Sequence, residues 1–161
     1  MKKILMMAVA LMMAVTMNAQ SEKGAMAVGG NFNIGLDNNY TNFGIGAKYS
    51  YNFIDHLRGE ASFDYFFKKD FISQWDINLN LHYVFDIANN KMGLYPLAGL
   101  TILSNHVDVW GATATNTNFG FNLGAGWEYR ISEHFKAGVE GKLQWADGGR
   151  GVISLGAAYI F

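Results

Sequence analysis

Eleven ionisable side chains fall on the polar positions of segments in which apolar and polar residues alternate. They are five basic residues, five acidic residues and one histidine: Lys48, Arg58, Glu60, Asp64, Asp76, His82, Glu128, Arg130, Lys136, Glu140 and Lys142. A period of two places such residues on one face of a sheet. If that face is enclosed, the charges must pair and hydrogen-bond, because their desolvation is otherwise not recovered. The near balance of sign predicts a salt-bridged network, and exchange between its pairs would instead make an ion gate.

A second group combines a hydroxyl, an imidazole and a carboxylate. Ser104, His106 and Asp108 alternate along the chain and are the residue types of a hydrolase. Neighbours on one face of a strand lie ~6.5–7 Å apart. A nucleophile and its base must approach to ~2.6–3.2 Å. We therefore expect polar loop residues here, and a hydrolytic site only if the side chains lean together.

Metal, thiol and nucleic-acid chemistry find little support in the composition. The chain has no cysteine, which excludes disulfides, cysteine-based zinc sites and a thiol nucleophile. No histidine has a second histidine or two acids at ligand spacing in the chain, so we expect no metal ion and no cofactor. A formal net charge of −1 lacks the basic footprint of a nucleic-acid-binding protein.

The composition favours one β domain. The 161 residues suit a single domain, and the hydrophobic half of the chain excludes disorder. Charged residues make up 16%, against ~25% in an average soluble domain. The chain is rich in glycine (19) and in aromatic residues (15%), and it has one proline. These proportions are typical of β structure.

The first 19 residues are predicted to be a signal peptide. Lys2 and Lys3 precede an uncharged apolar run over 4–16, and Ala19 offers a small residue for cleavage. The run is shorter than the ~20 residues of a spanning helix. The expected domains are therefore a signal peptide over 1–19 and a barrel over 20–161.

Eight segments of roughly 10–14 residues are predicted to be strands, each long enough for the ~9–11 residues of a tilted membrane crossing. They span 24–36, 42–52, 57–67, 74–85, 92–103, 118–130, 135–145 and 153–161. Pro96 lies within the fifth, where we expect a bulge, because proline removes a hydrogen bond of the ladder.

The connections between these strands differ by parity. Tight connections are expected at 53–56, 86–91 and 131–134. Longer or more polar ones are expected at 37–41, 68–73, 104–117 and 146–150. Short turns at one end and longer loops at the other are typical of a transmembrane barrel.

Side-chain size decides which face of the sheet is enclosed. The polar positions are rich in glycine and serine, whereas the apolar positions carry large aromatics. An eight-stranded barrel has an interior just wide enough for side chains, so the small set fits inside and the aromatics fit the lipid face. Tyr49, Tyr51 and Phe53 are expected in one interfacial girdle. The other girdle would hold Tyr65, Phe66, Phe67 and Trp75. A soluble exported barrel, with the faces inverted, is the alternative.

The C-terminal segment resembles the β-signal by which the barrel assembly machinery recognises outer-membrane proteins. Its key residues are Ser154, Gly156, Tyr159 and Phe161. With the export signal and eight strands, the chain resembles small outer-membrane barrels of the OmpA/OmpX type. That resemblance implies an all-β fold, an eight-stranded antiparallel up-and-down transmembrane barrel.

The resemblance also implies a location and a set of partners. We expect the outer membrane of a Gram-negative bacterium, with membrane lipids and the assembly machinery as partners and a monomer as the oligomeric state. The expected role is structural or one of surface interaction, with a largely closed lumen. A narrow porin-like channel is one alternative. An outer-leaflet lipid A hydrolase using Ser104, His106 and Asp108 is the other.

Overall fold

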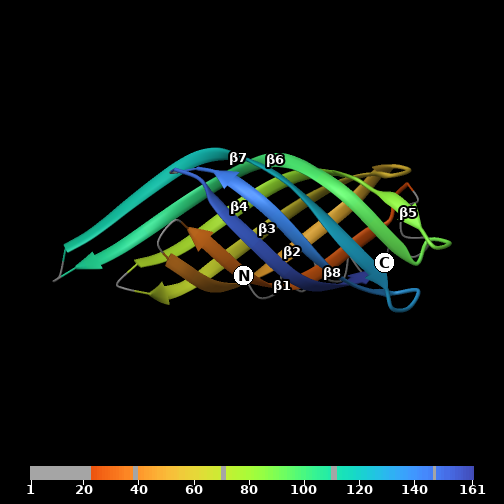
Figure 1. The fold of residues 1–161 in the computed structure, drawn as a ribbon, viewed down its shortest axis with the longest axis horizontal. Coiled ribbons are helices and arrows are strands. Elements are labelled where there is room, and N and C mark those ends of the chain that lie inside the picture. The colour runs from red at the N-terminus through yellow and green to blue at the C-terminus, as the bar shows by residue number, and fades with distance from the viewer. Residues whose placement is uncertain (1–22, 38–39, 70–71, 110–111, 147) are drawn as a thin grey trace, which may run out of the picture.

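A computed structural model describes residues 23–37, 40–69, 72–109, 112–146 and 148–161. This part of the chain is built from strands and turns (Figure 1). It contains no helix able to cross a membrane. The predicted signal peptide lies outside the described residues. The strands are β1 (Met26–Asp37), β2 (Tyr40–Ile54), β3 (Leu57–Lys69), β4 (Ile72–Tyr83), β5 (Phe85–Ile87), β6 (Met92–Val109), β7 (Ala112–Arg130), β8 (Phe135–Trp145) and β9 (Arg150–Ile160).

The strands close into an antiparallel barrel. Their order is β4-β3-β2-β1-β9-β8-β7-β6-β5, and a further pairing of β4 with β6 joins the two sides. The short β5 continues β4 after an interruption at Val84. β4 and β5 therefore occupy one strand position, and the nine labelled strands form an eight-stranded barrel. The predicted all-β, eight-stranded antiparallel barrel is confirmed. Closure leaves the sheet without the open edges that lipid cannot satisfy.

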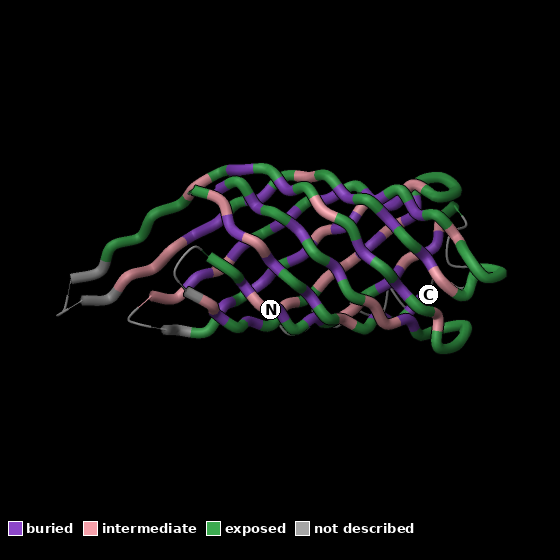
Figure 2. Tube along the Cα trace, in the orientation of Figure 1, coloured by how far each residue is buried: buried purple, intermediate pink, exposed green. Residues whose placement is uncertain are grey.

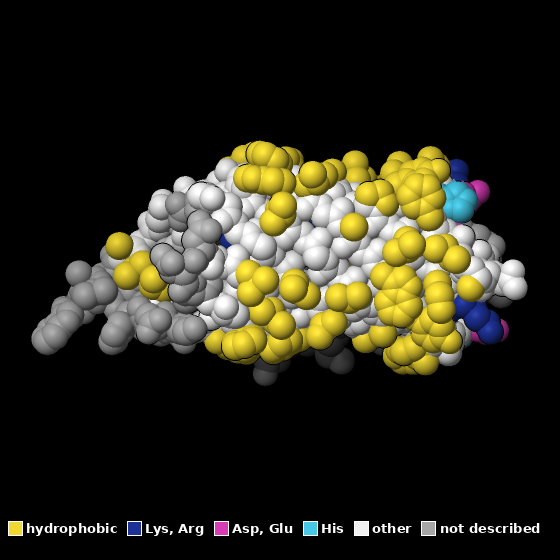
Figure 3. Space-filling view, viewed as in Figure 1, with side chains coloured by type: hydrophobic (Ala, Val, Ile, Leu, Met, Phe, Trp, Pro, Cys, Tyr) yellow, Lys and Arg dark blue, Asp and Glu magenta, His cyan; other side chains and the backbone are white. Residues whose placement is uncertain are grey.

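Alternation along each strand separates an inner from an outer face. In β4, buried and exposed residues alternate from Asp76 to Tyr83, and Figure 2 shows the same alternation around the barrel. The outer face carries large apolar side chains, among them Leu79 and Phe119, which are 59% and 69% exposed. Figure 3 shows such side chains over the visible face, with a few charged groups at one end. The apolar set therefore faces outward, as its size predicts.

The two ends of the barrel differ. The connections 55–56, 88–91 and 131–134 and the C-terminus lie at one end, which we call the turn end. His56 and three consecutive residues from Ala88 to Asn90 adopt positive φ there, as tight turns require. The opposite, loop end carries the β6–β7 hairpin, which projects past the other strands (Figure 1). The predicted loop over 104–117 is wrong, because most of it continues as paired strand from Ser104↔Thr117 to Val109↔Ala112.

The bulge predicted at Pro96 is also wrong. Pro96 pairs with Ala125 of β7 in an unbroken register. On its other side, pairing with β6 stops at His82↔Leu97 and resumes in the same register at Phe85↔Leu94. A two-residue gap in the ladder thus faces the proline, so no residue has to be inserted to accommodate its missing N–H. The structure places register shifts elsewhere, at Asn52/Ile54 and Phe66/Lys69.

Phe66 is a further correction, since it lies inside the barrel and not in an aromatic girdle. Its side chain is fully buried. Successive residues of a strand point to opposite faces, and Phe66 lies an even number of residues from the inward-facing Arg58, Glu60, Ser62 and Asp64 of β3. Its ring lies against the Arg150 guanidinium, 4.4 Å from ring centre to Cζ.

Candidate functional site

The interior of the barrel holds the ionisable residues that the sequence singles out. Lys48 and Arg130 are half-buried, and the other nine are buried. They come from β2, β3, β4, β7 and β8, whose inward positions alternate with apolar outward ones. Eight of them lie in three clusters along the barrel axis, Asp64 and Lys142 lie between two of these clusters, and Arg130 is the last residue of β7.

The turn-end cluster consists of Arg58, Glu128 and Lys136. Arg58 Nη1 donates to both carboxylate oxygens of Glu128 at 2.9 Å. Lys136 Nζ donates to Glu128 Oε2 at 3.1 Å. One carboxylate therefore binds two cations, and the three residues link β3, β7 and β8 across the lumen.

The middle cluster consists of Lys48, Glu60, His82, Tyr95 and Glu140. Lys48 Nζ lies 3.5 Å from Glu60 and 3.8 Å from Glu140. The Tyr95 hydroxyl donates to Glu140 Oε2 at 3.1 Å, and its ring stacks on His82 with 4.6 Å between centroids. The ring is also 4.8 Å from the Arg58 guanidinium, which connects this cluster to the turn-end one.

Tyr95 has room in the middle cluster because residue 126 is glycine. A Cβ at Gly126 would overlap the Tyr95 ring and hydroxyl. Tyr95 cannot be recognised as an inward residue from the sequence, because it precedes a proline in a stretch that is apolar on both faces.

The loop-end cluster is organised by Arg150. Its guanidinium forms a short ion pair with Asp76, donates to Gln144 Oε1 at 2.7 Å and donates to Gln74 Oε1 at 2.9 Å. Sequence reasoning placed Arg150 at the end of a loop and missed this role. The alternation of the last strand could have indicated this role. Arg150, Val152 and Ser154 lie two residues apart on one face of β9, and all three are buried.

Between the middle and loop-end clusters lies a layer of amides around Asp64, which we call the amide layer. Asp64 Oδ1 accepts hydrogen bonds from Asn31 at 2.7 Å and Asn33 at 2.6 Å. Asn122 donates to Asn78 at 3.0 Å and to Asn80 at 2.9 Å, crossing from β7 to β4. A search for charges alone could not find these residues. Lys142 Nζ lies 3.9 Å from Asp64 and 4.0 Å from Glu140, between this layer and the middle cluster.

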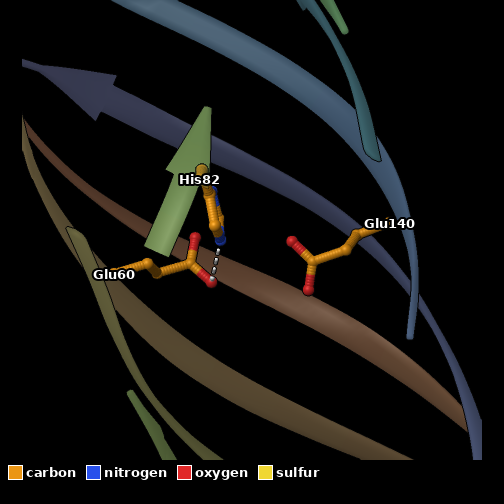
Figure 4. A group of neighbouring side chains, drawn as sticks. All are labelled: Glu60, His82 and Glu140. Carbon is orange, nitrogen blue, oxygen red and sulfur yellow. Dashed lines mark ion pairs between the residues drawn. The ribbon is translucent and has the colours of Figure 1, made fainter. Parts of the chain in front are cut away.

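Glu60, His82 and Glu140 form a compact group inside the middle cluster. One potential ligand atom from each lies within 4.8 Å of the other two. Figure 4 shows His82 between the two carboxylates, with its ring nitrogen directed toward Glu60 at 3.9 Å. Spacing along the chain could not reveal this group, because its members come from β3, β4 and β8.

A cavity of about 40 Å³ lies beside these charges. Lys48, Glu60, Glu128, Lys136 and Glu140 are among the residues that line it. A second cavity of about 10 Å³ lies nearer the turn end and shares Ala27, Ser50 and Lys136 with the first. Both are large enough only for individual water molecules or a small group of them.

Ser104 and His106 do not form a nucleophile–base pair with each other. The Ser104 hydroxyl lies 3.2 Å from the Thr117 hydroxyl, and Ser104 is 1% exposed. His106 Nδ1 lies 2.9 Å from the Thr115 hydroxyl. Both contacts run across the β6–β7 hairpin, whose register pairs these residues. The Asp108 side chain lies outside the described part of the structure.

The residues of the C-terminal motif close the barrel against β1. Ser154 donates to Asn33 Oδ1 at 2.6 Å, and Gly156 pairs with Asn31. Tyr159 faces outward and contacts His134, Phe135 and Phe161. The Phe161 amide donates to the Met26 carbonyl at 2.9 Å.

Comparisons with known proteins agree with this geometry. The β-barrel domain of Pseudomonas aeruginosa OprF is similar, with 18% identity, a TM-score of 0.74, and 86% of this chain and 98% of that chain covered. The attachment invasion locus protein Ail of Yersinia pestis has 21% identity and a TM-score of 0.64, with 86% and 99% covered. OprG of P. aeruginosa has 15% identity and a TM-score of 0.64, with 89% and 99% covered.

No curated protein matches significantly. A family model described as the outer membrane protein beta-barrel domain matches residues 6–161.

Proposed function

Because the chain belongs to the outer membrane protein β-barrel family, we propose that it is an integral outer-membrane barrel with a closed lumen and a structural or surface-interaction role. The membrane is that of a Gram-negative bacterium, reached after cleavage of the signal peptide over 1–19. Lipids contact the apolar outer face, and the barrel works as a monomer. The turn end faces the periplasm and the β6–β7 hairpin faces outward.

The filling of the lumen is the observation that carries the closed state. The turn-end, middle and loop-end clusters and the amide layer follow one another along the axis. Each contains contacts that cross the lumen, such as Arg58 to Glu128, Asn122 to Asn78 and Arg150 to Gln74. Eight strands enclose just enough space for side chains, so these contacts among the described residues support a lumen without a continuous aqueous path.

Conductance across a planar lipid bilayer tests the closed lumen. We expect the wild-type protein to give no steady ion current. A variant that truncates one crossing contact at each level, Arg58→Ala/Glu140→Ala/Asn122→Ala/Arg150→Ala, should conduct, because polar contacts are then removed along the whole lumen. Leu143→Ala, on the outward side of β8, is the matched control and should stay silent. A steady current through the wild type would contradict the closed lumen.

A narrow channel is the second candidate, and the cavity beside the middle cluster favours it. The cavity of about 40 Å³ lies against Lys48, Glu60 and Glu140, whose ion pairs of 3.5 and 3.8 Å are longer than direct hydrogen bonds. Such pairs can exchange partners. If the wild type conducts, Arg58→Ala or Glu140→Gln should change the current, whereas the charge-neutral Leu143→Ala should not.

A further inference from the structure

The imidazole of His82 has an unsatisfied nitrogen in the centre of the barrel. His82 is fully buried, and its Nε2 forms no hydrogen bond in the described part of the chain. A buried polar atom without a partner is costly, so something that can bind it is expected nearby. Nε2 faces Glu60 at 3.9 Å, which exceeds the length of a hydrogen bond.

Arg58 determines which ring nitrogen of His82 carries the hydrogen. Arg58 Nε donates to His82 Nδ1 at 3.3 Å, and Arg58 Nη2 lies 3.1 Å from the same atom. A guanidinium has only donors, so Nδ1 must accept. The imidazole is therefore neutral and carries its hydrogen on Nε2, which points as a donor toward the carboxylates.

A group that binds between His82, Glu60 and Glu140 must accept one hydrogen bond and donate two. It must accept from His82 Nε2–H and donate to the carboxylates of Glu60 and Glu140, whose oxygens have only acceptor capacity when ionised. Because the three atoms lie within 4.8 Å of one another, a point exists within about 2.8 Å of all three. That distance is the length of a hydrogen bond to oxygen.

We propose that Glu60, His82 and Glu140 bind one water molecule in the middle of the lumen. The water donates to both carboxylates and accepts from His82 Nε2–H, and Lys48 Nζ lies 3.5 Å from Glu60 and 3.8 Å from Glu140. Buried waters typically make about three hydrogen bonds, so this site matches their requirements. The cavity of about 40 Å³ is lined by Glu60 and Glu140, so it borders two of the three residues of the site.

The same residues are poorly suited to a metal ion. A metal ligand must present a lone pair, but the Nε2 lone pair is not free while Arg58 holds the hydrogen on that atom. Lys48 Nζ also lies within 4 Å of both carboxylates and already supplies a cation. This assignment holds whether or not the lumen conducts, since it depends only on local geometry.

Nitrogen-15 NMR of histidine-labelled full-length protein in detergent micelles tests the site. We expect the His82 ring in the Nε2–H form, with a cross-peak between that proton and water. Adding stoichiometric Zn²⁺ should leave the His82 signals unchanged. An Nδ1–H or doubly protonated ring, a missing water cross-peak, or a shift of His82 on adding Zn²⁺ would each overturn the proposal.

Two substitutions sharpen the result. Glu140→Gln weakens an acceptor of the water, so exchange of the His82 Nε2–H with solvent should accelerate about tenfold. Asp86→Asn is the matched control, because Asp86 lies 3.3 Å from His56 at the turn end and should alter only the His56 signals. Unchanged exchange in folded Glu140→Gln would contradict the proposal. If that variant does not fold, the wild-type spectrum alone decides.

Discussion

Arg58 of β3 binds both carboxylate oxygens of Glu128 in β7, at 2.9 Å, although these strands are not neighbours in the sheet. The chain separates the two residues by 70 positions. Contacts of this kind connect opposite sides of the barrel, in addition to the backbone hydrogen bonds that join neighbouring strands. The same carboxylate binds Lys136 of β8.

Removing Arg58 should strongly destabilise the barrel. Arg58→Ala leaves Glu128 with one cation in place of two, and breaking a buried pair typically costs about 3–5 kcal/mol. The free energy of unfolding in urea, followed by tryptophan fluorescence, measures it. Arg58→Ala/Glu128→Ala should cost at least about 1 kcal/mol less than the sum of the single variants. Additive costs would show that the two side chains do not interact. Lys91→Ala, exposed at the turn end, should stay within about 0.5 kcal/mol of the wild type.

Gly126→Ala should disturb the interior, whereas Gly141→Ala should not. A methyl group at residue 126 overlaps the Tyr95 ring, so we expect a cost of about 1–3 kcal/mol from overpacking. At Gly141 nothing lies within 4 Å of the added carbon. The same unfolding measurement compares the pair. Equal stabilities would mean that Tyr95 does not occupy the space above Gly126.

An arginine on the outer face should cost an amount that depends on depth. Leu79 lies midway along the strand formed by β4 and β5 and is 59% exposed. Ile131 lies in a turn and is 64% exposed. In lipid vesicles, Leu79→Arg should destabilise the barrel by about 2–4 kcal/mol and Ile131→Arg by about 0–1 kcal/mol. In a soluble barrel both sites would face water, and the two costs would then be similar and small.

Ser104→Ala should leave the lipids of the outer leaflet unchanged. Ser104 and His106 each contact a threonine across the hairpin, so neither is arranged to activate the other. Mass spectrometry of lipid A from cells expressing the wild type or the variant measures the outcome. A mass change with the wild type that is lost with Ser104→Ala would instead establish the hydrolase.

Much of the architecture was predictable because strand periodicity is a local property. The strand predicted over 135–145 and the observed β8 coincide, and five of the eleven selected ionisable residues lie in β3 and β4 on the buried face. Alternation of apolar and polar residues identifies a strand wherever the two faces of the sheet differ in polarity. The alternation is weakest over 92–103, which is apolar on both faces and contains Pro96.

The site was harder to predict because it depends on which side chains meet across the lumen. Arg150 falls in a predicted loop, yet it organises the loop-end cluster with Asp76, 74 positions away. Its residue type predicts Phe66 in an aromatic girdle, although its position at an even step from Asp64 along β3 places it inside. The group formed by Glu60, His82 and Glu140 depends on barrel closure, which no spacing along the chain encodes.

The pairing of β1 with β9 has a consequence for how the chain could be reordered. The Phe161 amide binds the Met26 carbonyl, so the first and last strands meet at the same end of the barrel. A short linker could join them, and a new break in any turn would leave every pairing intact. Circular permutation would then place another strand at the C-terminus and the predicted β-signal of β9 inside the chain. Such permutants would separate what makes the barrel fold from what marks it for insertion.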